Sequence, residues 1–570
     1  MIDRTVKDRM SSLLAGIYPE DDSETLLDMI DNLVERHRRD IVTHRLKNGA
    51  SNARYEFDQN DVFLITYADV AREQDASPLA SLHRLLAEHA NGLFSFVHIL
   101  PFYPYSSDDG FSVVDYKEVN PRFGSWSDVE RLAGRYRLMF DAVLNHISVK
   151  SHWFTGFLAG ESTFEQFFIE RDVNADYSRV VRPRITPLFT SFESLKGTKD
   201  LWTTFSPDQV DLNFHNPRVL LAVLDVLLFY VARGASAIRL DAINYLWKEP
   251  GTICSNLPQC HAVIRLMRAL LDAVCPWIPL ITETNILHAD NITYLADGFS
   301  EAQMVYQFAL PPLVVHSYLS GDMSKLSAWA KELTFGEGTS YFNFLASHDG
   351  VGIIPVGNIL DKREMDALAA LAVARGGYVS YKSNDGGEDV PYELNCTWWE
   401  LISDPAEPME TNIRKYVASH AILLALRGVP ALYCHSLFGA ENDHEGVRET
   451  GMKRSVNRRK YALTELRQNL ENGRTGRIYG EVKALIETRK KFRAFSPASG
   501  QEIMELHPAV LAVLRTAGDA DQVLTLANAS GHPVTVRLPI PGCLIAGSGA
   551  LNAGHIMLEP HGFAWLEVER

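Results

Sequence analysis

A short apolar stretch, 235-ASAIRLDA-242, carries two side chains that can do chemistry together. Its apolar and β-branched residues, preceded by Gly234, predict a buried parallel strand with a polar carboxyl end. Arg239 and Asp241 stand two residues apart, so their side chains point to the same face of that strand. A neighbouring arginine lowers the pKa of an aspartate and favours its ionised form. Asp241 is therefore a candidate nucleophile, and a structural Arg–Asp pair is the alternative.

Other polar side chains stand where further predicted strands end. They are Asn145-His146, Glu283, His348-Asp349 and, in the loop after another strand, Asp108-Asp109-Gly110-Phe111. A single histidine or aspartate near a strand end is more often a satisfied structural group. Several that converge on the carboxyl rim of one barrel indicate a functional site, because that rim is where barrel enzymes do their chemistry.

Two carboxylates on this rim suggest glycosidic chemistry. Asp241 and Glu283 are one strand–helix unit apart, so they should face one mouth, the first as nucleophile and the second, with a raised pKa, as acid and then base. A separation of about 5 Å between the carboxyl groups would indicate retention of configuration. Asp349 could support an oxocarbenium-like transition state. Sugar hydroxyls could bind His146 and His348, and the pyranose ring could pack on Phe111 and Tyr245.

The elements that must position these groups read as a (β/α)8 barrel of the α/β class. Eight apolar runs, separated by helix-like segments, are the strand candidates: 61–68, 92–102, 136–146, 235–242, 277–284, 301–310, 340–349 and 429–434. We expect a helical extension at 1–58, the barrel at 59–146 and 213–494, an inserted domain at 147–212, a second insertion at 350–400, and a C-terminal β-sandwich at 495–570.

Composition narrows the class of protein. The 570 residues are 46% hydrophobic and 22% charged, which is ordinary for a globular chain with a large core. A net charge of −16 argues against a general binder of nucleic acid or anionic membranes. No apolar run approaches the roughly 18 residues of a membrane span. The start of the chain lacks a signal-peptide pattern, and the six cysteines form no C-x-x-C pair. We therefore expect a reduced, cytoplasmic protein.

Short motifs give the chain a resemblance to a known family. It resembles glycoside hydrolase family 13, the α-amylase family, through 141-DAVLNH-146, 237-AIRLDA-242, 281-ITET-284 and 344-FLASHD-349. It is more closely similar to the sucrose phosphorylase subfamily. That similarity rests on HILPFYPYSSDDGF (98–111), RPR (182–184), DQVDLN (208–213), the KE-PGT-C pattern (248–254), FALPPLVVHS (308–317) and SHDGVG (347–352). The resemblance covers roughly residues 61–500.

The resemblance implies a role for each of these residues. Asp241 would form a β-glucosyl-enzyme, Glu283 would be the acid/base and Asp349 the transition-state stabiliser. Asp108 with Arg458 would bind the far O4 end of glucose. The remaining pocket residues that it implies are His146, Gln209, Arg239, Tyr245 and His348. Members of this subfamily need no metal, and the sequence shows no dedicated calcium loop, so we expect neither a metal nor a cofactor.

A phosphorylase needs a site for phosphate, which requires positive charge and hydrogen-bond donors. The inserted domain offers Arg182-Pro183-Arg184, although this could be only a solvated basic turn. In enzymes similar to sucrose phosphorylase, the positions that resemble Arg184 and Tyr392 meet phosphate. The prediction is reversible phosphorolysis of a small-molecule α-glucoside by inorganic phosphate, with release of α-glucose 1-phosphate and retention of configuration. The chain would act as a monomer or homodimer.

The loop at 381–399 should decide which group leaves with the other half of the substrate. Glu393 stands where sucrose-specific enzymes carry glutamine, so the chain looks closer to relatives that act on glucosylglycerol or glucosylglycerate. The loop carries Asp385, Glu388, Asp389 and Glu393 against one Lys382. Such acidic side chains accept hydrogen bonds from diols and repel anions, which favours glycerol as leaving group and 2-O-α-glucosylglycerol as substrate. Arg184 or Lys382 could still accommodate an anion.

Other functions remain open from the sequence. The first alternative is a glucosylglycerate phosphorylase, followed by a sucrose or sucrose 6′-phosphate phosphorylase. An α-glucosidase or transglucosylase is a further alternative, and would work equally fast without phosphate. A non-catalytic barrel is disfavoured because Asp241, Glu283 and Asp349 are all present.

Overall fold

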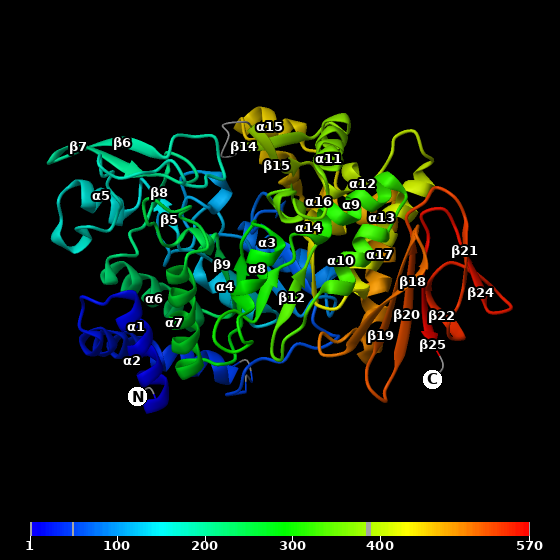
Figure 1. Cartoon of the computed structure of the whole chain (residues 1–570), viewed down its shortest axis with the longest axis horizontal. Helices are drawn as coiled ribbons and strands as arrows, with labels where there is room; N and C mark the ends of the chain where they lie inside the picture. The colour runs from blue at the N-terminus through cyan, green and yellow to red at the C-terminus, as the bar shows by residue number, and fades with distance from the viewer. Residues whose placement is uncertain (1–2, 48, 50, 384–388, 569–570) are drawn as a thin grey trace.

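The chain folds around a closed barrel of eight parallel strands (Figure 1), in a computed structural model that describes residues 3–47, 49, 51–383 and 389–568. The strands in barrel order are β1 (Phe63–Thr66), β16 (Val429–Tyr433), β12 (Ser340–Asn343), β11 (Met304–Tyr306), β10 (Leu280–Glu283), β9 (Ala235–Asp241), β4 (Arg137–Val143) and β3 (Phe96–Ile99). Each lies within one of the eight apolar runs, which confirms the predicted barrel.

Helices connect the strands and cover the outside of the barrel. They are α3 (Pro78–His89), α4 (Trp126–Ala133), α6 (Pro217–Ala232), α7 (Pro258–Val274), α8 (His288–Asn291), α9 (Leu310–Ser320), α10 (Ser324–Glu332), α13 (Met409–Ala425), α14 (Cys434–Leu437), α16 (Leu463–Glu471) and α17 (Gly473–Lys491). Because both faces of the sheet are covered, its strands are buried along most of their length and do not alternate between buried and exposed positions. The buried pattern of β1, β3, β10 and β12 is continuous for this reason.

The segment between β4 and α6 forms a small lobe beside the barrel mouth. It contains α5 (His152–Leu158) and two antiparallel strand pairs: β5 (His146–Ser148) with β8 (Gln209–Asp211), and β6 (Phe189–Ser194) with β7 (Gly197–Trp202). A buried ammonium ties this lobe to the barrel. Lys248 Nζ lies 2.6 Å from Asp211 Oδ2 and donates to Asn145 Oδ1 at 2.6 Å, and all three side chains are buried.

A second set of elements follows β12 above the same rim. It comprises β13 (Val351–Gly352), α11 (Lys362–Ala374), β14 (Tyr378–Ser383), β15 (Asp389–Asn395) and α12 (Trp398–Ile402). Strands β14 and β15 pair antiparallel, and β13 pairs with β15. Asp385 and Glu388, two of the acidic residues predicted in this loop, lie outside the described residues. After β16, α15 (His444–Thr450) leads to a 3-10 helix, η6 (Lys453–Asn457), beside β15.

The N-terminal segment packs on the outside of the barrel. Helix α1 (Arg4–Ile17) lies against α7, and α2 (Ser23–Lys47) lies against α6. Tyr18 donates to the Phe214 carbonyl at 2.8 Å, and His37 contacts Asp225 at 2.8 Å. The expectation of helix over all of 1–58 is wrong at its end: α2 stops at Lys47, and Gly49 adopts a left-handed φ of 60°, which helices use to terminate.

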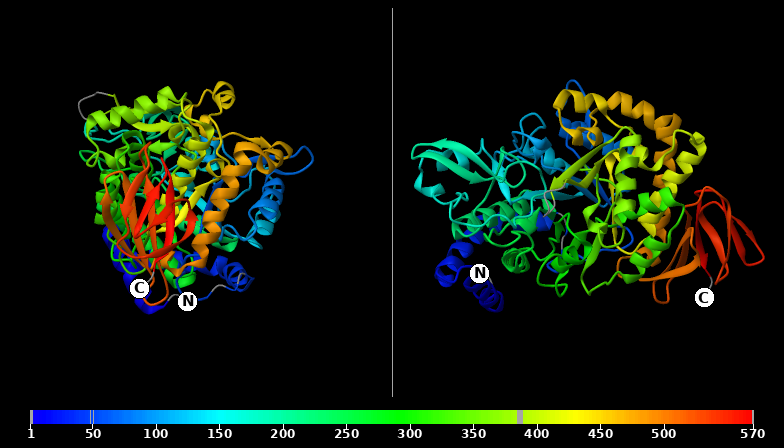
Figure 2. Two further views of the ribbon diagram at one scale, coloured as in Figure 1. Left: turned by 90° about the vertical axis from the view of Figure 1, so that its right-hand side faces the viewer. Right: turned by 45° about the horizontal axis from the view of Figure 1, so that its top comes forward.

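Two antiparallel sheets form the end of the chain. One has the order β18 (Gly500–His507), β19 (Val510–Thr516), β20 (Gln522–Asn528), β25 (Phe563–Val568), β22 (Gly542–Gly547), and the other has β21 (Val534–Arg537), β24 (His555–Leu558), β23 (Ala550–Asn552). They lie at the opposite end of the long axis from α1 and α2 (Figures 1 and 2). In the part of the chain that the structure describes, no helix is both long and apolar enough to span a membrane.

Candidate active site

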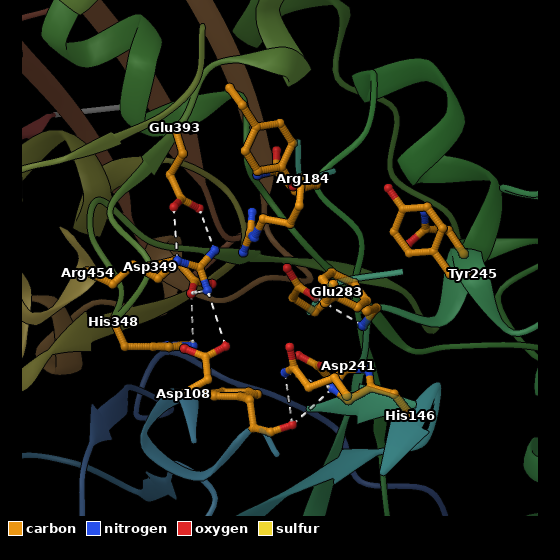
Figure 3. Close-up of a pocket in the computed structure, with 17 residues that line it drawn as sticks. Asp108, His146, Arg184, Asp241, Tyr245, Glu283, His348, Asp349, Glu393 and Arg454 are labelled. Carbon is orange, nitrogen blue, oxygen red and sulfur yellow. Dashed lines mark hydrogen bonds and ion pairs between the residues drawn. The ribbon is translucent and has the colours of Figure 1, made fainter. Parts of the chain in front are cut away.

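A small cavity of about 60 Å³ lies at the carboxyl end of the barrel strands (Figure 3). Most of the residues singled out from the sequence line it, from parts of the chain that lie far apart in the sequence. These are Asp108, Phe111, His146, Arg184, Gln209, Asp241, Tyr245, Glu283, His348, Asp349, Tyr392 and Glu393. Arg239 and Arg458, also predicted, stand behind the lining and contact its carboxylates instead.

Strands β9 and β10 bring two of these carboxylates side by side. Asp241 and Glu283 are direct partners in the register of the two strands, and each is the last residue of its strand. The Glu283 carboxylate also accepts a hydrogen bond from the Ala242 backbone at 3.1 Å. Ala242 holds a left-handed φ of 50°, a strained conformation of the kind that clusters at functional sites.

Arg239 is shared among three carboxylates. Its guanidinium donates to Asp241 Oδ1 at 2.8 Å, lies 3.7 Å from Glu283 Oε2 and forms a short ion pair with Asp141. Asp141 in turn contacts His98 at 2.7 Å, and both are fully buried. The sequence analysis quoted Asp141 within its motif but gave it no role. Its position on β4, next to β9, makes it the third anion around one cation.

This sharing corrects the expected ionisation of Asp241. Burial raises the pKa of Asp241, the carboxylates of Glu283, Asp141 and Asp349 raise it further, and Arg239 lowers it without reversing the shift. Burial likewise raises the pKa of Glu283. Arg239 lies closer to Asp241 than to Glu283, and this distance favours Glu283 as the carrier of a proton shared by the two carboxylates. Arg239 alone was expected to keep Asp241 ionised. Because Arg239 is shared, Asp241 also needs Glu283 to carry the proton.

The opposite wall carries a second group of charges. Arg458 lies 3.3 Å from both Asp108 and Asp109 and donates to the His348 carbonyl at 3.0 Å. Asp108 and Asp109 have φ of 52° and 48°, which is strained backbone for residues with side chains. Gly110 follows with φ of 115°, and a Cβ there would lie 2.4 Å from the Pro101 carbonyl oxygen. Only glycine fits that position, so this turn fixes where Asp108 points.

Aromatic and imidazole rings line the cavity between these charged groups. Phe111 stacks on His348 with ring centroids 4.7 Å apart and planes 3° apart. The side-chain amide nitrogen of Gln209 lies 3.2 Å from His146 Nε2. The same His146 nitrogen lies 2.9 Å from the Phe111 carbonyl oxygen. Burial lowers the pKa of both histidines, so they are neutral hydrogen-bonding groups. Burial raises the pKa of Tyr245 to about 12, so its hydroxyl remains protonated.

The third wall comes from the two segments above the barrel. Arg184 places its guanidinium 5.7 Å from the Tyr392 ring and 5.9 Å from the Phe205 ring, and it donates to the Pro183 carbonyl. Arg184 forms no salt bridge with any other residue that the structure describes. Arg182, its neighbour in the same tripeptide, is turned to the Thr186 carbonyl at 3.0 Å and does not line the cavity.

Glu393 differs from its expected environment. It is buried, and Arg454 binds it through two hydrogen bonds of 3.1 and 3.0 Å. Asn395 donates to the same carboxylate at 2.8 Å. Asp389, a second acidic group of the loop, is exposed, and neither it nor Lys382 lines the cavity. The loop was expected to present surplus negative charge to the acceptor, but its acidic group in the cavity is paired with an arginine.

Arg454 is the main residue that the sequence analysis missed. It also lies 2.7 Å from Asp349 Oδ1, yet its motif, 453-KRSVNRRKY-461, was used only for Arg458. The available signal was that Arg454 belongs to the same short basic run as Arg458. The other missed lining residues are Phe205, Ala242, Asn244 and Asn285.

Comparison with known proteins places this site in a family. Residues 94–388 match the family model described as "Alpha amylase, catalytic domain". The chain is 46% identical over 527 residues to a glucosylglycerate phosphorylase of Spirochaeta thermophila, covering 92% of this chain and 89% of that protein. It is 28% identical over 450 residues to a glucosylglycerol phosphorylase of Marinobacter adhaerens, covering 77% and 88%.

A solved structure gives the same result at the level of the fold. The crystal structure of a sucrose 6F-phosphate phosphorylase from Thermoanaerobacter thermosaccharolyticum superposes with a TM-score of 0.73 at 25% identity, covering 84% of this chain and 95% of that one. The barrel, the charged cavity at its carboxyl rim and these similarities agree. This chain therefore belongs to the α-amylase family, glycoside hydrolase family 13, and within it to the phosphorylases related to sucrose phosphorylase.

Proposed function

We propose that this protein is a glucosylglycerate phosphorylase, which converts an α-glucosylglycerate and phosphate to α-glucose 1-phosphate and glycerate. The observation that carries the proposal is the 46% identity, over 92% of the chain, to a relative with that activity in its name. The glucosylglycerol phosphorylase in the same comparison is only 28% identical. We therefore replace glycerol, the leaving group that the charges of the loop favoured, with glycerate, the leaving group of the first alternative.

Glucosyl transfer would start at β9 and β10. Asp241 attacks C1 of the glucosyl unit, and Glu283 gives its proton to the glycosidic oxygen as the bond from C1 to that oxygen breaks. Glycerate leaves with the proton, and the glucose remains as a β-ester on Asp241. The raised pKa of Glu283 favours the acid form that this step needs.

Phosphate would then complete the reaction. Glu283, now ionised, takes a proton from phosphate as one phosphate oxygen attacks C1 and the ester bond to Asp241 breaks. Two inversions at C1 give a product with the α configuration of the substrate. Asp349 would stabilise positive charge on the ring during both steps, and Asp108 with Arg458 would bind the far end of the glucose.

Both acceptors in this scheme are anions, and one cation in the cavity suits both. Arg184 has a guanidinium next to the Tyr392 and Phe205 rings, on the side of the cavity away from Asp108 (Figure 3). A planar guanidinium binds carboxylate and phosphate oxygens in pairs. We assign it to phosphate in one half-reaction and to the glycerate carboxylate in the other, with the protonated Tyr392 hydroxyl as a further donor.

The charge of the cavity supports an anionic acceptor over glycerol. Glu393 was the strongest argument for a neutral diol, and it is already bound by Arg454 and Asn395. A carboxylate satisfied in this way repels an incoming anion less than an ionised group without a cation. What remains on the acceptor side is the positive charge of Arg184.

Synthesis from α-glucose 1-phosphate tests the proposal directly. Phosphate release would be measured with glycerate, glycerol, fructose and fructose 6-phosphate at equal concentration. Glycerate should give the highest kcat/KM. Faster synthesis with glycerol would restore the neutral acceptor, and the highest rate with either fructose compound would identify a sucrose-type enzyme. Glucose release from glucosylglycerate at the same rate without phosphate would exclude a phosphorylase.

A further inference from the structure

Arg454 contacts carboxylates that belong to different walls of the cavity. Its Nη1 atom lies 2.7 Å from Asp349 Oδ1 and 3.9 Å from Asp108 Oδ2. Its Nε and Nη2 atoms bind Glu393 on β15 at 3.1 and 3.0 Å. The side chain is 15% exposed, so these interactions occur with little water between the charges. Figure 3 shows the guanidinium between Glu393 above it and Asp349 and Asp108 below it.

We propose that Arg454 is a positioning residue that locks the acceptor hairpin, β14–β15, to the glucose-binding wall. One edge of its guanidinium holds Asp349 against the cavity, and the other edge holds Glu393. The inference rests on glucosyl transfer at this site, as proposed above, and assigns to Arg454 the coupling between its two halves.

The segment that carries Arg454 holds both strands of the hairpin. Lys453, the residue before it, donates to the Val379 carbonyl on β14 at 2.9 Å. Arg454 itself binds Glu393 on β15. On the hairpin, Asn395 donates to Glu393 and to the Asp349 carbonyl, both within 2.9 Å. Adjacent residues of η6 therefore fix two strands to one loop, and a shift of the hairpin would pull on Asp349 through Arg454.

Charge gives the same contact a second effect. Burial raises the pKa of Asp349, but Arg454 lowers it more than any other neighbour, ahead of His348, Arg458 and Arg239, and the net pKa lies well below the ordinary value. The other ionisable groups that face Asp349 are Glu283 and Asp241. Removal of Arg454 takes away the largest of the lowering influences, so burial and the two carboxylates are opposed by less positive charge, chiefly Arg458 at 3.7 Å, and the pKa of Asp349 should rise.

The test uses Arg454→Met and Arg454→Lys in the full-length protein. Glucosyl transfer from α-glucosyl fluoride, whose fluoride leaves without an acid, reports on the glucose side independently of the acceptor. We expect Arg454→Met to lower its kcat about 10²- to 10³-fold. We also expect the acidic limb of kcat to move to higher pH, because Asp349 protonates sooner. Lysine keeps the positive charge but not the paired hydrogen bonds to Glu393. Arg454→Lys should therefore return the acidic limb of kcat to its wild-type pH but should not return the KM for phosphate to its wild-type value.

Glu393→Gln tests the other edge. It should raise KM for phosphate and for glycerate at least about tenfold, with a smaller loss of kcat than Arg454→Met. In the Glu393→Gln/Arg454→Met double variant the two effects should not add, since both break one contact. Arg459→Met is the matched control: Arg459 belongs to the same segment but pairs with Glu465 at the surface, and its loss should leave activity unchanged.

Two results would overturn the proposal. One is an Arg454→Met enzyme in which the acidic limb of kcat does not move and thermal melts show that a smaller folded fraction explains the lost activity. The other is a double variant in which the effects of Glu393→Gln and Arg454→Met on KM add. The first reading uses α-glucosyl fluoride and the second uses the KM for phosphate, both on folded protein, so they hold even if the wild-type enzyme prefers a leaving group other than glycerate. A wild type that transfers glucose but ignores glycerate would fail the proposed function and leave the role of Arg454 intact.

Discussion

The two halves of the cavity are built in different ways. The glucose side consists of strand ends and a strained turn, where Asp241, Glu283 and Asp108 are held by Arg239 and Arg458 at distances of 2.8 to 3.7 Å. The acceptor side consists of segments added to the barrel: the lobe that carries Arg184 and the hairpin that carries Tyr392 and Glu393. In the proposed mechanism, the glucosyl chemistry stands on the strand ends of the barrel, and the choice of acceptor stands on the added segments.

The largest effect expected from this difference lies at the nucleophile. Asp241→Asn removes the only group proposed to form the covalent ester, so phosphorolysis should fall at least about 10⁴-fold. Mass spectrometry of the variant with α-glucosyl fluoride should find no glucosyl-protein adduct. Asp366→Asn, at an exposed aspartate paired with Lys362, is the control and should retain full activity. Turnover by Asp241→Asn above a few per cent of wild type would assign the ester to another residue.

The acid/base gives the next largest effect and carries a pH signature. The pKa of Glu283 is raised by burial, and the acid must be protonated to act, so kcat/KM should fall as pH rises through that raised pKa. Glu283→Gln should lower phosphorolysis about 10²- to 10⁴-fold and abolish the basic limb of the pH profile. Steady-state rates between pH 5 and 9 provide the measurement. A basic limb that persists in Glu283→Gln would exclude Glu283 as its source.

The next prediction concerns the contact between Lys248 and Asp211, which attaches the lobe between β4 and α6 to the barrel and so connects the two halves of the cavity. Lys248→Met leaves Asp211 buried without its cation, which should lower the free energy of unfolding by about 3–5 kcal/mol. Denaturant unfolding followed by circular dichroism measures this. Lys362→Met removes an exposed ion pair as control and should cost under about 0.5 kcal/mol. Equal, small changes in both variants would mean that the buried ammonium is not what attaches the lobe.

The acceptor side should give the smallest but most selective effect. Arg184→Met should raise KM for phosphate and for glycerate about 10- to 100-fold, since a charge-assisted pair is lost in a partly dehydrated cavity. Arg182→Met is the matched control two residues away, with its guanidinium directed to Thr186. Initial rates in both directions separate the two anions. If only the KM for phosphate rises, Arg184 does not bind the glycerate carboxylate.

Sequence patterns predicted the placement of the strand-end residues well, because these residues sit at fixed offsets from apolar runs. Asp241 and Glu283 each end a strand, and the pairing of neighbouring strands follows from the barrel alone. The acceptor side could not be predicted in this way. Charges along residues 381–393 predict an acidic loop, but the partner that neutralises Glu393 lies 61 residues further on. Likewise, β22, β23 and β24 lack a clear alternation of apolar residues and were not predicted.

The three-way sharing of Arg239 has a consequence for the order of events. In the proposed mechanism, ester formation removes the negative charge of Asp241 while Arg239 stays in place. The guanidinium then has one anion fewer to balance, and its attraction for Glu283, 3.7 Å away, increases. The pKa of Glu283 should fall at the moment when it must stop being an acid and become a base. The covalent intermediate itself would thus prepare Glu283 for phosphate, without movement of any backbone atom.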